Sequence, residues 1–256
     1  MSLYYQDDYV TLHHGDCLEI MPSLAGRSVD MILADLPYGT TRNNWDSIID
    51  LQSMWQNYGC ISKENAAIVL TAQTPFDKVL GASNLEDLRY EWIWEKTSAT
   101  GHLNAKRAPM KAHENILVFY KSLPTYNPQM TSGHVRKVST ADHKRNSSGT
   151  SNYGEFGLTG YDSTDRYPRS VLEFATDKQK EALHPTQKPL ALMAYLIRTY
   201  TNAGDIVLDN CAGSGSTLIA ARRQGRRAVG IELDEAYCEV IATRLSQEGF
   251  EMEWTA

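Results

Sequence analysis

The chain has 256 residues, 42% of them hydrophobic, and a formal net charge of −6, which suits one large domain or one domain with an excursion. No apolar run reaches the ~20 residues of a membrane-spanning helix, and the first ten residues lack the pattern of a signal peptide. These features predict a cytoplasmic protein without a membrane span.

Seven short apolar runs of the β type follow one another along the chain, and several are rich in Val, Ile and Leu with little alternation. Such runs are expected for strands that are buried on both faces. They cover residues 9–14, 29–35, 66–72, 90–96, 114–121, 205–210 and 227–233. Residues 189–200 and 235–247 instead repeat apolar side chains at helical spacing. The alternation predicts an α/β fold with a doubly wound, mostly parallel, seven-stranded sheet.

Residues 122–170 interrupt this rhythm. They are rich in Ser, Thr, Gly, Asn and Tyr and have little apolar periodicity. A structureless stretch of this length inside a compact domain is more often functional or disordered than accidental. Residues 96–147 carry nine Lys or Arg against two acidic side chains, which leaves −13 on the rest of the chain. A basic face on an acidic body is compatible with phosphate contact, and a solvated polar loop is the alternative.

The four cysteines are scattered, with no CxxC pair, at positions 17, 60, 211 and 238. This usage predicts free thiols in a reduced, cytoplasmic protein and no metal site.

The sequence DNCAGSGST at 209–217 indicates a turn from a strand into a helix. Gly213 and Gly215 allow a sharp turn and a close approach to a ligand. The next strand ends at Glu232, which is placed to accept hydrogen bonds from ribose hydroxyls. NAD and S-adenosylmethionine both use this geometry, but Leu218 stands where the dinucleotide fingerprint needs a third glycine. A plain connecting turn is the alternative interpretation.

A second pair of acidic residues ends two strands near the N-terminus. Asp16 follows the strand at 9–14, and Asp35 ends the strand at 29–35. If these strands continue the sheet begun at 205–233, the acidic residues line its carboxyl edge, where such sheets bind ligands. The domain is then circularly permuted, and we expect its two ends to lie close together.

Four motifs, in this order, resemble those of the permuted, or beta, group of amino-methylating DNA methyltransferases of the N6-adenine and N4-cytosine type. They are ADLPY at 34–38, HENILVFYK at 113–121, HPTQKP at 184–189 and DNCAGSGST at 209–217. The resemblance covers nearly the whole chain except 122–170. It implies an S-adenosylmethionine-dependent fold in which 1–121 is the catalytic half, 122–170 the target-recognition excursion and 171–256 the cofactor-binding half.

The chain departs from the family pattern at three positions. Leu36 replaces a proline, and Asn210 with Cys211 replaces a Pro-Phe pair. The family's phenylalanine is expected to border the cofactor, so Cys211 predicts a looser pocket. Leu36 still supplies the backbone carbonyl that the chemistry uses.

The DLPY segment suits the methylation of an exocyclic amino group, whose lone pair is delocalised into the base. The Asp35 carboxylate and the Leu36 carbonyl would accept hydrogen bonds from the amino group and free that pair. Pro37 holds the turn, and Tyr38 offers a flat face to an extruded base. Positioning then supplies much of the rate, and no metal or covalent nucleophile is required.

The resemblance also implies a set of cofactor-binding residues. We expect Lys188 to meet the cofactor carboxylate, with a solvated helix-capping lysine as the alternative, and His184 is a weaker candidate. The full cofactor-binding set is Asp16, Asp35, Lys188, Asp209, Cys211, Gly213, Gly215, Ser216, Thr217 and Glu232.

Target recognition needs groove or phosphate contacts outside the pocket. The basic stretch, the excursion and the loop after the catalytic motif are the candidates, although Trp45 is as well explained by a structural role. The predicted contacts to double-stranded DNA are Arg42, Trp45, Lys106, Arg107, Lys111, Arg136, Lys137, Lys144 and Arg145. The sequence is compatible with either a monomer or a homodimer.

Aspartate at position 35 favours adenine N6 as the target, since the resembled cytosine enzymes more often have serine there. Cytosine N4 methylation is the nearest alternative because it asks the same of the pocket. An RNA or protein methyltransferase, or a non-catalytic DNA-binding module, is a more distant alternative. Pairing with a restriction enzyme is compatible with the motifs.

Overall fold

The computed structural model describes residues 2–39, 48–139, 160–176 and 187–253. It has two compact units, of which the first comprises Met1–Asn127 with Ser170–Ala256 and the second Pro128–Arg169. No helix within the described ranges is both long and apolar enough to cross a membrane.

The first unit is built on a nine-stranded sheet with the order β1-β2-β11-β10-β3-β4-β6-β5-β9. The strands are β1 (Ser2–Gln6), β2 (Val10–His14), β3 (Val29–Asp35), β4 (Ser62–Ala72), β5 (Leu88–Thr100), β6 (Lys111–Phe119), β9 (Val171–Phe174), β10 (Ile206–Asp209) and β11 (Arg227–Glu232). The five strands from β2 to β4 in this order are parallel to one another. Strand β1 pairs antiparallel with β2, and β6 pairs antiparallel with both β4 and β5. Strand β9 pairs parallel with β5. The prediction of seven strands is therefore wrong in number, and the sheet is mixed.

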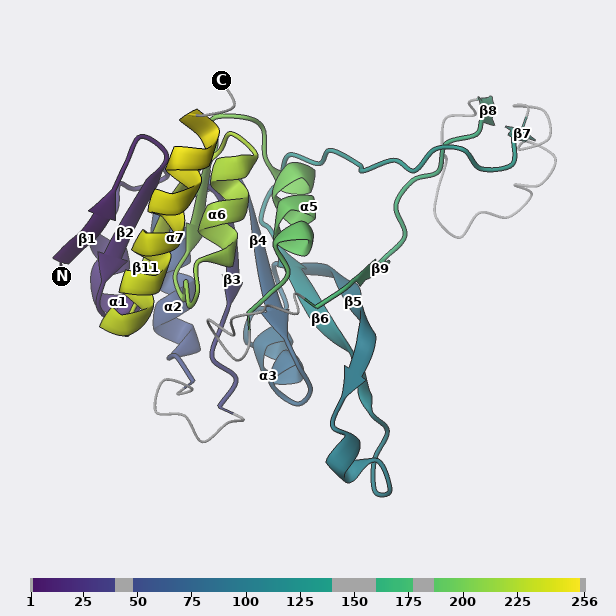
Figure 1. Ribbon diagram of the computed structural model, residues 1–256. Coiled ribbons are helices and arrows are strands. Elements are labelled where there is room, and N and C mark those ends of the chain that lie inside the picture. Colours follow the sequence, from purple (N-terminus) through teal and green to yellow (C-terminus); the bar gives the residue numbers. More distant parts are fainter. Residues whose placement is uncertain (1, 40–47, 140–159, 177–186, 254–256) are drawn as a thin grey trace. The chain divides into compact units, whose positions relative to one another are not determined.

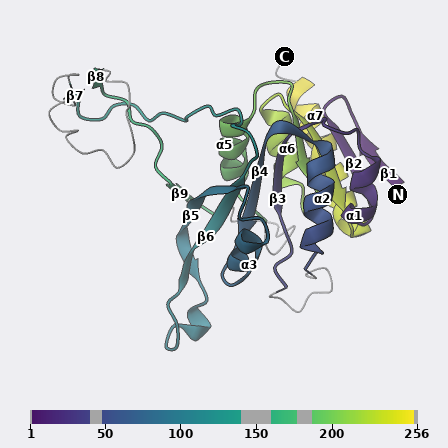
Figure 2. The same cartoon turned by 180° about the vertical axis from the view of Figure 1, so that it is seen from behind.

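Helices cover both faces of this sheet (Figures 1 and 2). One face carries α1 (Cys17–Ile20), α2 (Leu51–Ile61) and α3 (Phe76–Ser83). The other carries α5 (Leu190–Tyr200), α6 (Ser216–Arg223) and α7 (Glu235–Glu253). This arrangement is the doubly wound α/β architecture that the apolar runs predicted.

The helices begin where the sequence supplies caps. The Asp50 carboxylate accepts a hydrogen bond from the Ser53 amide, 2.9 Å away, at the start of α2. Pro189, which lacks the amide hydrogen that a helix start leaves unpaired, precedes α5. Apolar spacing over the 11 residues of α5, about three turns, then places Leu192, Leu196 and Ile197 in the core.

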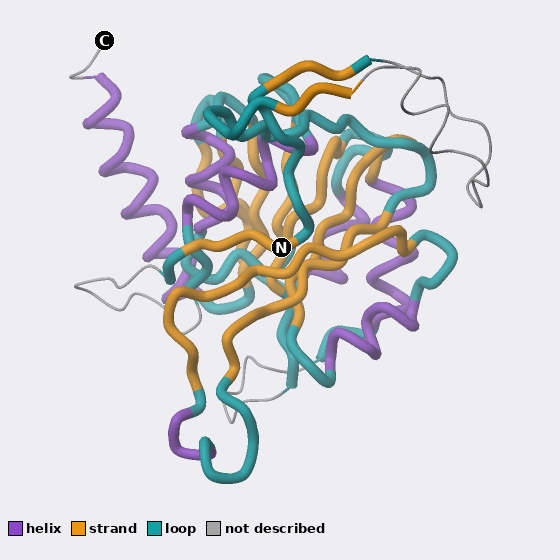
Figure 3. Tube along the Cα trace, turned by 90° about the vertical axis from the view of Figure 1, so that its right-hand side faces the viewer, coloured by secondary structure: helices purple, strands orange, loops and turns teal. Residues whose placement is uncertain are grey.

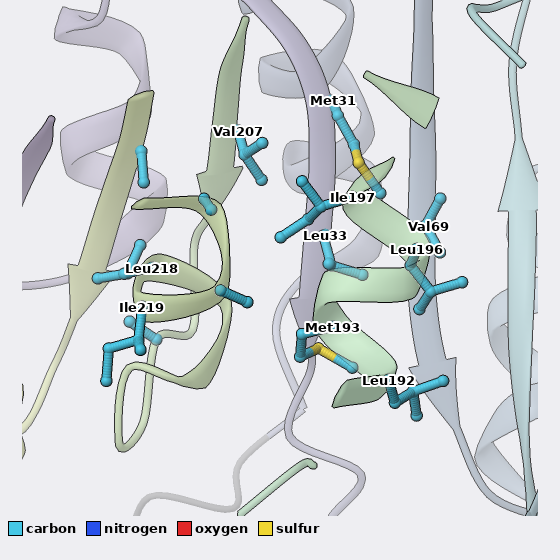
Figure 4. Close-up of a cluster of buried hydrophobic side chains, with 14 of the residues drawn as sticks. Met31, Leu33, Val69, Leu192, Met193, Leu196, Ile197, Val207, Leu218 and Ile219 are labelled. Atoms are coloured by element: carbon cyan, nitrogen blue, oxygen red, sulfur yellow. The ribbon is translucent and has the colours of Figure 1, made fainter. Parts of the chain in front are cut away.

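The core between α5, α6 and the central strands is made of aliphatic side chains (Figure 4). Met31 and Leu33 of β3 and Val69 of β4 face Met193 and Leu196 of α5, and all five are at most 3% exposed. Full burial on both faces explains why these strands show no apolar–polar alternation in the sequence.

The two ends of the chain contribute neighbouring elements. Tyr4 Oη in β1 donates a hydrogen bond to a carboxylate oxygen of Glu239 in α7, 2.9 Å away. Strands β10 and β11, from the C-terminal part, lie between β2 and β3, which are consecutive N-terminal strands.

Strands β5 and β6 form a long hairpin that extends beyond the rest of the sheet and carries a short 3-10 turn, His102–Asn104, near its tip (Figure 3). The second unit is smaller. Its strands β7 (Lys137–Ser139) and β8 (Tyr161–Ser163) pair antiparallel, and Thr131 bridges to Arg166.

Candidate functional site

A cavity of about 760 Å³ lies at the carboxyl ends of the parallel strands. This volume suits a ligand of cofactor size. All four catalytic candidates and all but one of the cofactor candidates line it. They are Asp16, Asp35, Leu36, Pro37, Tyr38, Lys188, Asp209, Cys211, Gly213, Ser216, Thr217 and Glu232.

The remaining candidate, Gly215, does not line the cavity but shapes the turn beside it. It precedes α6 with φ of +80°, a conformation that L side chains rarely adopt. A Cβ atom at this position would lie 3.0 Å from Cγ1 of Ile241. Gly215 is therefore required by the backbone and by packing against α7.

Leu218 explains the absent third glycine of the turn. Its side chain is fully buried, and it occupies the space beside Gly230 of β11, where an added Cβ would lie 2.5 Å from Leu218 Cδ1. The close approach of helix and strand is thus provided by a glycine on the strand instead of one on the helix.

Two buried carboxylates stand on either side of the glycine turn. Glu232 accepts hydrogen bonds from the amides of Gly213, at 2.7 Å, and Asp234, at 2.9 Å, one on each oxygen. Asp209 Oδ1 accepts from the Cys211 amide at 3.1 Å. Burial raises the pKa of the Asp209 carboxyl to about 7 and also raises the pKa of Glu232. Acceptor capacity remains on both carboxylates, because each oxygen has two lone pairs.

Asp35 is held by three donors at the end of β3. Its Oδ1 accepts from Tyr38 Oη at 2.6 Å and from Thr71 Oγ1 at 2.5 Å. Its Oδ2 lies 2.5 Å from the Lys188 ammonium. Three of about four lone-pair positions are therefore used, and the remaining one is on Oδ2.

Lys188 belongs to a buried cluster of four charged groups. Its ammonium also lies 3.4 Å from Glu114 Oε2, and Lys96 lies 2.5 Å from Glu114 Oε1. Burial alone would lower the pKa of Lys188, but Asp35 and Glu114 outweigh it and raise that pKa. Burial alone would likewise raise the pKa of Glu114, but the two ammonium groups hold it below its ordinary value. With a side chain only 7% exposed, Lys188 is not a solvated capping residue, so that alternative is wrong.

Tyr38 is held by contacts at both its hydroxyl, which is bonded to Asp35, and its ring. Its ring stacks on Phe76 with centroids 5.5 Å apart, and the Lys188 ammonium is 5.7 Å from the ring centroid. Burial, followed by the charges of Asp35 and Glu114, raises the pKa of its hydroxyl well above the usual value.

The motif resemblance is matched by a family model. The model describes a DNA methylase of the N6/N4 type, and residues 29–244 of this chain match it. The chain belongs to this DNA methylase family.

Relatives and solved structures agree with this membership. Over 255 residues the methylase chain is 28% identical to the DNA adenine methyltransferase YhdJ of Escherichia coli K12, covering 92% of this chain and 82% of that protein. It is 22% identical to the type II methyltransferase M.ScaI of Streptomyces caespitosus, with 96% and 84% covered. The fold resembles the cytosine-N4-specific PvuII DNA methyltransferase, with a TM-score of 0.70 at 15% identity and coverage of 94% and 88%. It also resembles the crystal structure of the M1.HpyAVI–SAM complex, with a TM-score of 0.63 at 23% identity and coverage of 92% and 98%.

Several residues that line the methylase cavity were not among the sequence candidates. Glu114, Lys96 and Thr71 surround Asp35 and Lys188, and Cys17 lies beside Cys211. Glu114 was within a recognised motif, HENILVFYK, but its partner on β5 could not be inferred from that motif. Among the described residues, no group of three or more His, Cys, Asp or Glu side chains is arranged to hold a metal ion.

The predicted DNA contacts fall into separate parts of the methylase. Lys106, Arg107 and Lys111 are exposed on the β5–β6 hairpin of the first unit. In the second unit Lys137 is exposed, and Arg136 forms a two-pronged pair with Asp162, with distances of 2.7 and 2.5 Å. The candidates Arg42, Trp45, Lys144 and Arg145, and also His184, lie outside the described residues.

Proposed function

We propose that this DNA methylase transfers a methyl group from S-adenosylmethionine to the exocyclic N6 amino group of adenine in double-stranded DNA. The observation that carries the proposal is the Asp35 carboxylate, held at the cavity wall with one acceptor position left over. The similarity to the DNA adenine methyltransferase YhdJ supports adenine as the target.

The cavity has the polar groups that this cofactor needs. Glu232 and Asp209 provide acceptors for ribose hydroxyls and negative charge near a sulfonium cation. The Ser216 hydroxyl and both amide atoms of Gln187 are buried, line the cavity and have no hydrogen-bond partner among the residues that the structure describes. Buried polar groups are normally satisfied, so a polar ligand is expected to complete them. When bound, S-adenosylmethionine would supply the electrophilic methyl group.

Asp35 would act on the amino group of the target base. Its spare acceptor, together with the Leu36 carbonyl, would receive the N–H bonds and draw the nitrogen toward tetrahedral geometry. Asp35 would then hold the proton that the amine loses after methylation. A rotation of Tyr38 away from Oδ1 would free a second position and expose the ring face on which the extruded base stacks.

We further propose that Lys188 holds Asp35 rather than the carboxylate of the cofactor. Its ammonium is already shared between Asp35 and Glu114, and Lys96 balances the second carboxylate. The cluster is neutral as a whole, so no charge in it is buried without a partner.

The DNA backbone would be bound by residues outside the cavity. The basic tip of the β5–β6 hairpin and the basic residues of the second unit are the proposed contacts, with residues 122–170 as the target-recognition region. The strand order, with β10 and β11 between β2 and β3, supports the proposed circular permutation.

The decisive experiment is a nucleoside analysis. DNA is incubated with the protein and methyl-labelled S-adenosylmethionine, digested, and separated to identify the labelled nucleoside. Label in N6-methyldeoxyadenosine supports the proposal, whereas label in N4-methyldeoxycytidine would replace adenine by the alternative target. Asp35→Ala is the matched control: it should fold and transfer no label. Near-normal turnover by this variant would contradict the proposed role of Asp35.

A further inference from the structure

Two thiols meet in the wall of the cavity. Cys17 follows β2 and Cys211 follows β10, and β11 is the one strand between them in the sheet. Both residues line the cavity, and both sulfur atoms lie within 3.6 Å of the same atom, Nδ2 of Asn210. Two thiols 194 positions apart in the chain are thus brought to one amide group by the fold.

Asn210 fixes this pair in place. Its Oδ1 accepts a hydrogen bond from the fully buried Tyr58 hydroxyl at 2.6 Å, which sets the orientation of the amide. The opposite end, Nδ2, then lies 3.6 Å from Cys17 Sγ and 3.5 Å from Cys211 Sγ. One amide group therefore donates toward both sulfur atoms. A thiolate accepts such a bond better than a thiol, so the arrangement favours the reactive form.

The two thiols are unequal. Interaction with the Cys211 thiol lowers the pKa of the Cys17 thiol. Burial, which is next in size, opposes this effect, and the bond from Asn210 adds to the lowering. The bond with Cys17 and burial raise the pKa of Cys211 well above its usual value. Cys17 is thus the nucleophile of the pair, and Cys211 is the neighbouring thiol that can resolve an oxidised Cys17.

We propose that Cys17 and Cys211 form a redox-active dithiol that a hydroperoxide converts into a disulfide inside the cavity. The Cys17 thiolate attacks the peroxide oxygen, the O–O bond breaks, and Cys17 sulfenic acid and water (or an alcohol) are formed. The Cys211 thiol then attacks that sulfur, the S–O bond breaks, and a second water leaves as the disulfide forms. Two electrons pass from the two sulfurs to the peroxide, and a dithiol reductant reverses the change.

The disulfide would alter the cavity directly. It would remove both sulfur acceptors from Asn210 and tie the start of the turn that carries Gly213 to the start of α1. This consequence rests on the proposed cofactor site, whereas the formation of the disulfide does not.

The test uses the full chain treated with hydrogen peroxide. Intact mass is expected to fall by two hydrogen atoms per chain, and peptide mapping without reductant should join the peptides of Cys17 and Cys211. Cys60→Ser is the matched control, since Cys60 is exposed on α2 and outside the cavity, and it should give the same result. Cys17→Ser and Cys211→Ser should each abolish the loss of mass. Disulfides only through Cys60, or overoxidation of Cys17 without a Cys17–Cys211 link, would overturn the proposal.

Phenylarsine oxide provides a measurement that needs no variant. It bridges two neighbouring thiols, so one equivalent should bind the reduced wild-type chain and protect both cysteines from alkylation, and failure to bind would count against the dithiol. Binding of S-adenosylmethionine is then compared before oxidation, after oxidation and after dithiothreitol. Weaker binding that dithiothreitol restores supports the consequence for the cavity. If the reduced protein does not bind S-adenosylmethionine at all, the proposed function fails while the mass measurements still decide on the dithiol.

Discussion

The ammonium of Lys188 lies 2.5 Å from Oδ2 of Asp35, although 153 positions separate the two residues in the chain. Asp35 ends β3, and Lys188 stands just before α5, which packs on the same strand. The side chain of Lys188 reaches under the DLPY turn and has Glu114 as its second partner. A cation so placed fixes the direction of the Asp35 carboxylate.

We expect Lys188→Met to lower the rate of methyl transfer at saturating substrates by roughly 10–100-fold, the equivalent of a charge-assisted hydrogen bond worth about 1.5–3 kcal/mol. Lys188→Arg, which keeps the charge, should lose less. Single-turnover methylation separates this loss from binding. An unchanged kcat with a raised KM for S-adenosylmethionine would instead assign Lys188 to the cofactor.

The contributions of the Tyr38 ring and of its hydroxyl can be measured separately. Tyr38→Ala should weaken binding of target DNA by about 1–3 kcal/mol, the scale for stacking of a base on an aromatic ring. Tyr38→Phe keeps the ring and removes only the hydroxyl, with its bonds to Asp35 and Thr71, so its DNA affinity should stay close to that of the wild type. The comparison is made by titrating DNA in the presence of S-adenosylhomocysteine. Equal losses in both variants would show that the ring face does not carry the contact.

Glu232→Gln should weaken S-adenosylmethionine binding by about 1–1.5 kcal/mol, the difference between a charge-assisted and a neutral hydrogen bond to a ribose hydroxyl. Glutamine keeps the length of the side chain and one acceptor for the Gly213 or Asp234 amide, so the turn is disturbed less than by alanine. Calorimetric titration measures the affinity, with thermal unfolding as the control for folding. A folded variant with unchanged affinity would remove Glu232 from the cofactor site.

The buried Asp209 makes the ligand-free protein sensitive to pH. Its pKa is about 7 in the folded chain against an ordinary value of 3.8, so between these values the folded state keeps a proton that the unfolded state has released. Stability therefore falls as the pH rises through this window. Asp209→Asn cannot ionise and should remove roughly 2–3 kcal/mol of the fall between about pH 5 and about pH 8. Urea unfolding of both proteins measures the difference, and identical pH profiles would refute the assignment.

The two basic regions make separable predictions about DNA. Each phosphate contact that is lost should reduce the slope of log affinity against log salt by about 0.9. The fourfold alanine variant of Arg136, Lys137, Lys144 and Arg145 is compared with the triple variant of Lys106, Arg107 and Lys111. Cofactor affinity should barely change in either variant, because the proposed cofactor contacts, the Gly213 turn and Glu232, belong to the sheet edge of the first unit.

Wild-type affinity and slope in the fourfold variant, with a reduced slope in the triple variant, would assign the phosphate contacts to the hairpin. A residue that reads a base edge would behave differently, since its loss relaxes sequence preference as well as affinity.

The strands that were predicted most closely are those buried on both faces. The run at 29–35 coincides with β3, because five of its seven residues are apolar and buried, and only Asp30 and Asp35 are partly exposed. By contrast, β5 continues to Thr100, four residues past the predicted end, because its exposed extension pairs through backbone bonds and needs no apolar side chains. Strands β1 and β9 lie at the two edges of the sheet. They are only five and four residues long and their side chains are mostly exposed or half-exposed, so they form no apolar run long enough to predict a strand.

The same distinction applies to the site. Asp35 and Glu232 could be placed from strand ends alone, because parallel strands bring their carboxyl ends to one edge. Their partners could not, since Lys188 reaches Asp35 through the packing of α5, and Glu114 reaches Lys188 from an antiparallel strand. The proximity of Cys17 to Cys211 could not be predicted either, because no sequence signal links the two residues.

The position of β10 and β11 between β2 and β3 has a consequence for synthesis of the chain. In the sheet, Val10 is opposite Ala228, and Met31 is opposite Val207, so two apolar N-terminal strands have no partners on those sides until the last strands leave the ribosome. Unpaired apolar edges are templates for association with other chains, and contacts of such long sequence separation form slowly. A nascent chain that stops after α5 lacks the glycine turn and Glu232, so one wall of its cavity is missing. The enzyme is therefore expected to fold after synthesis and to depend on chaperones more than a protein of the same size whose neighbouring strands follow one another in sequence.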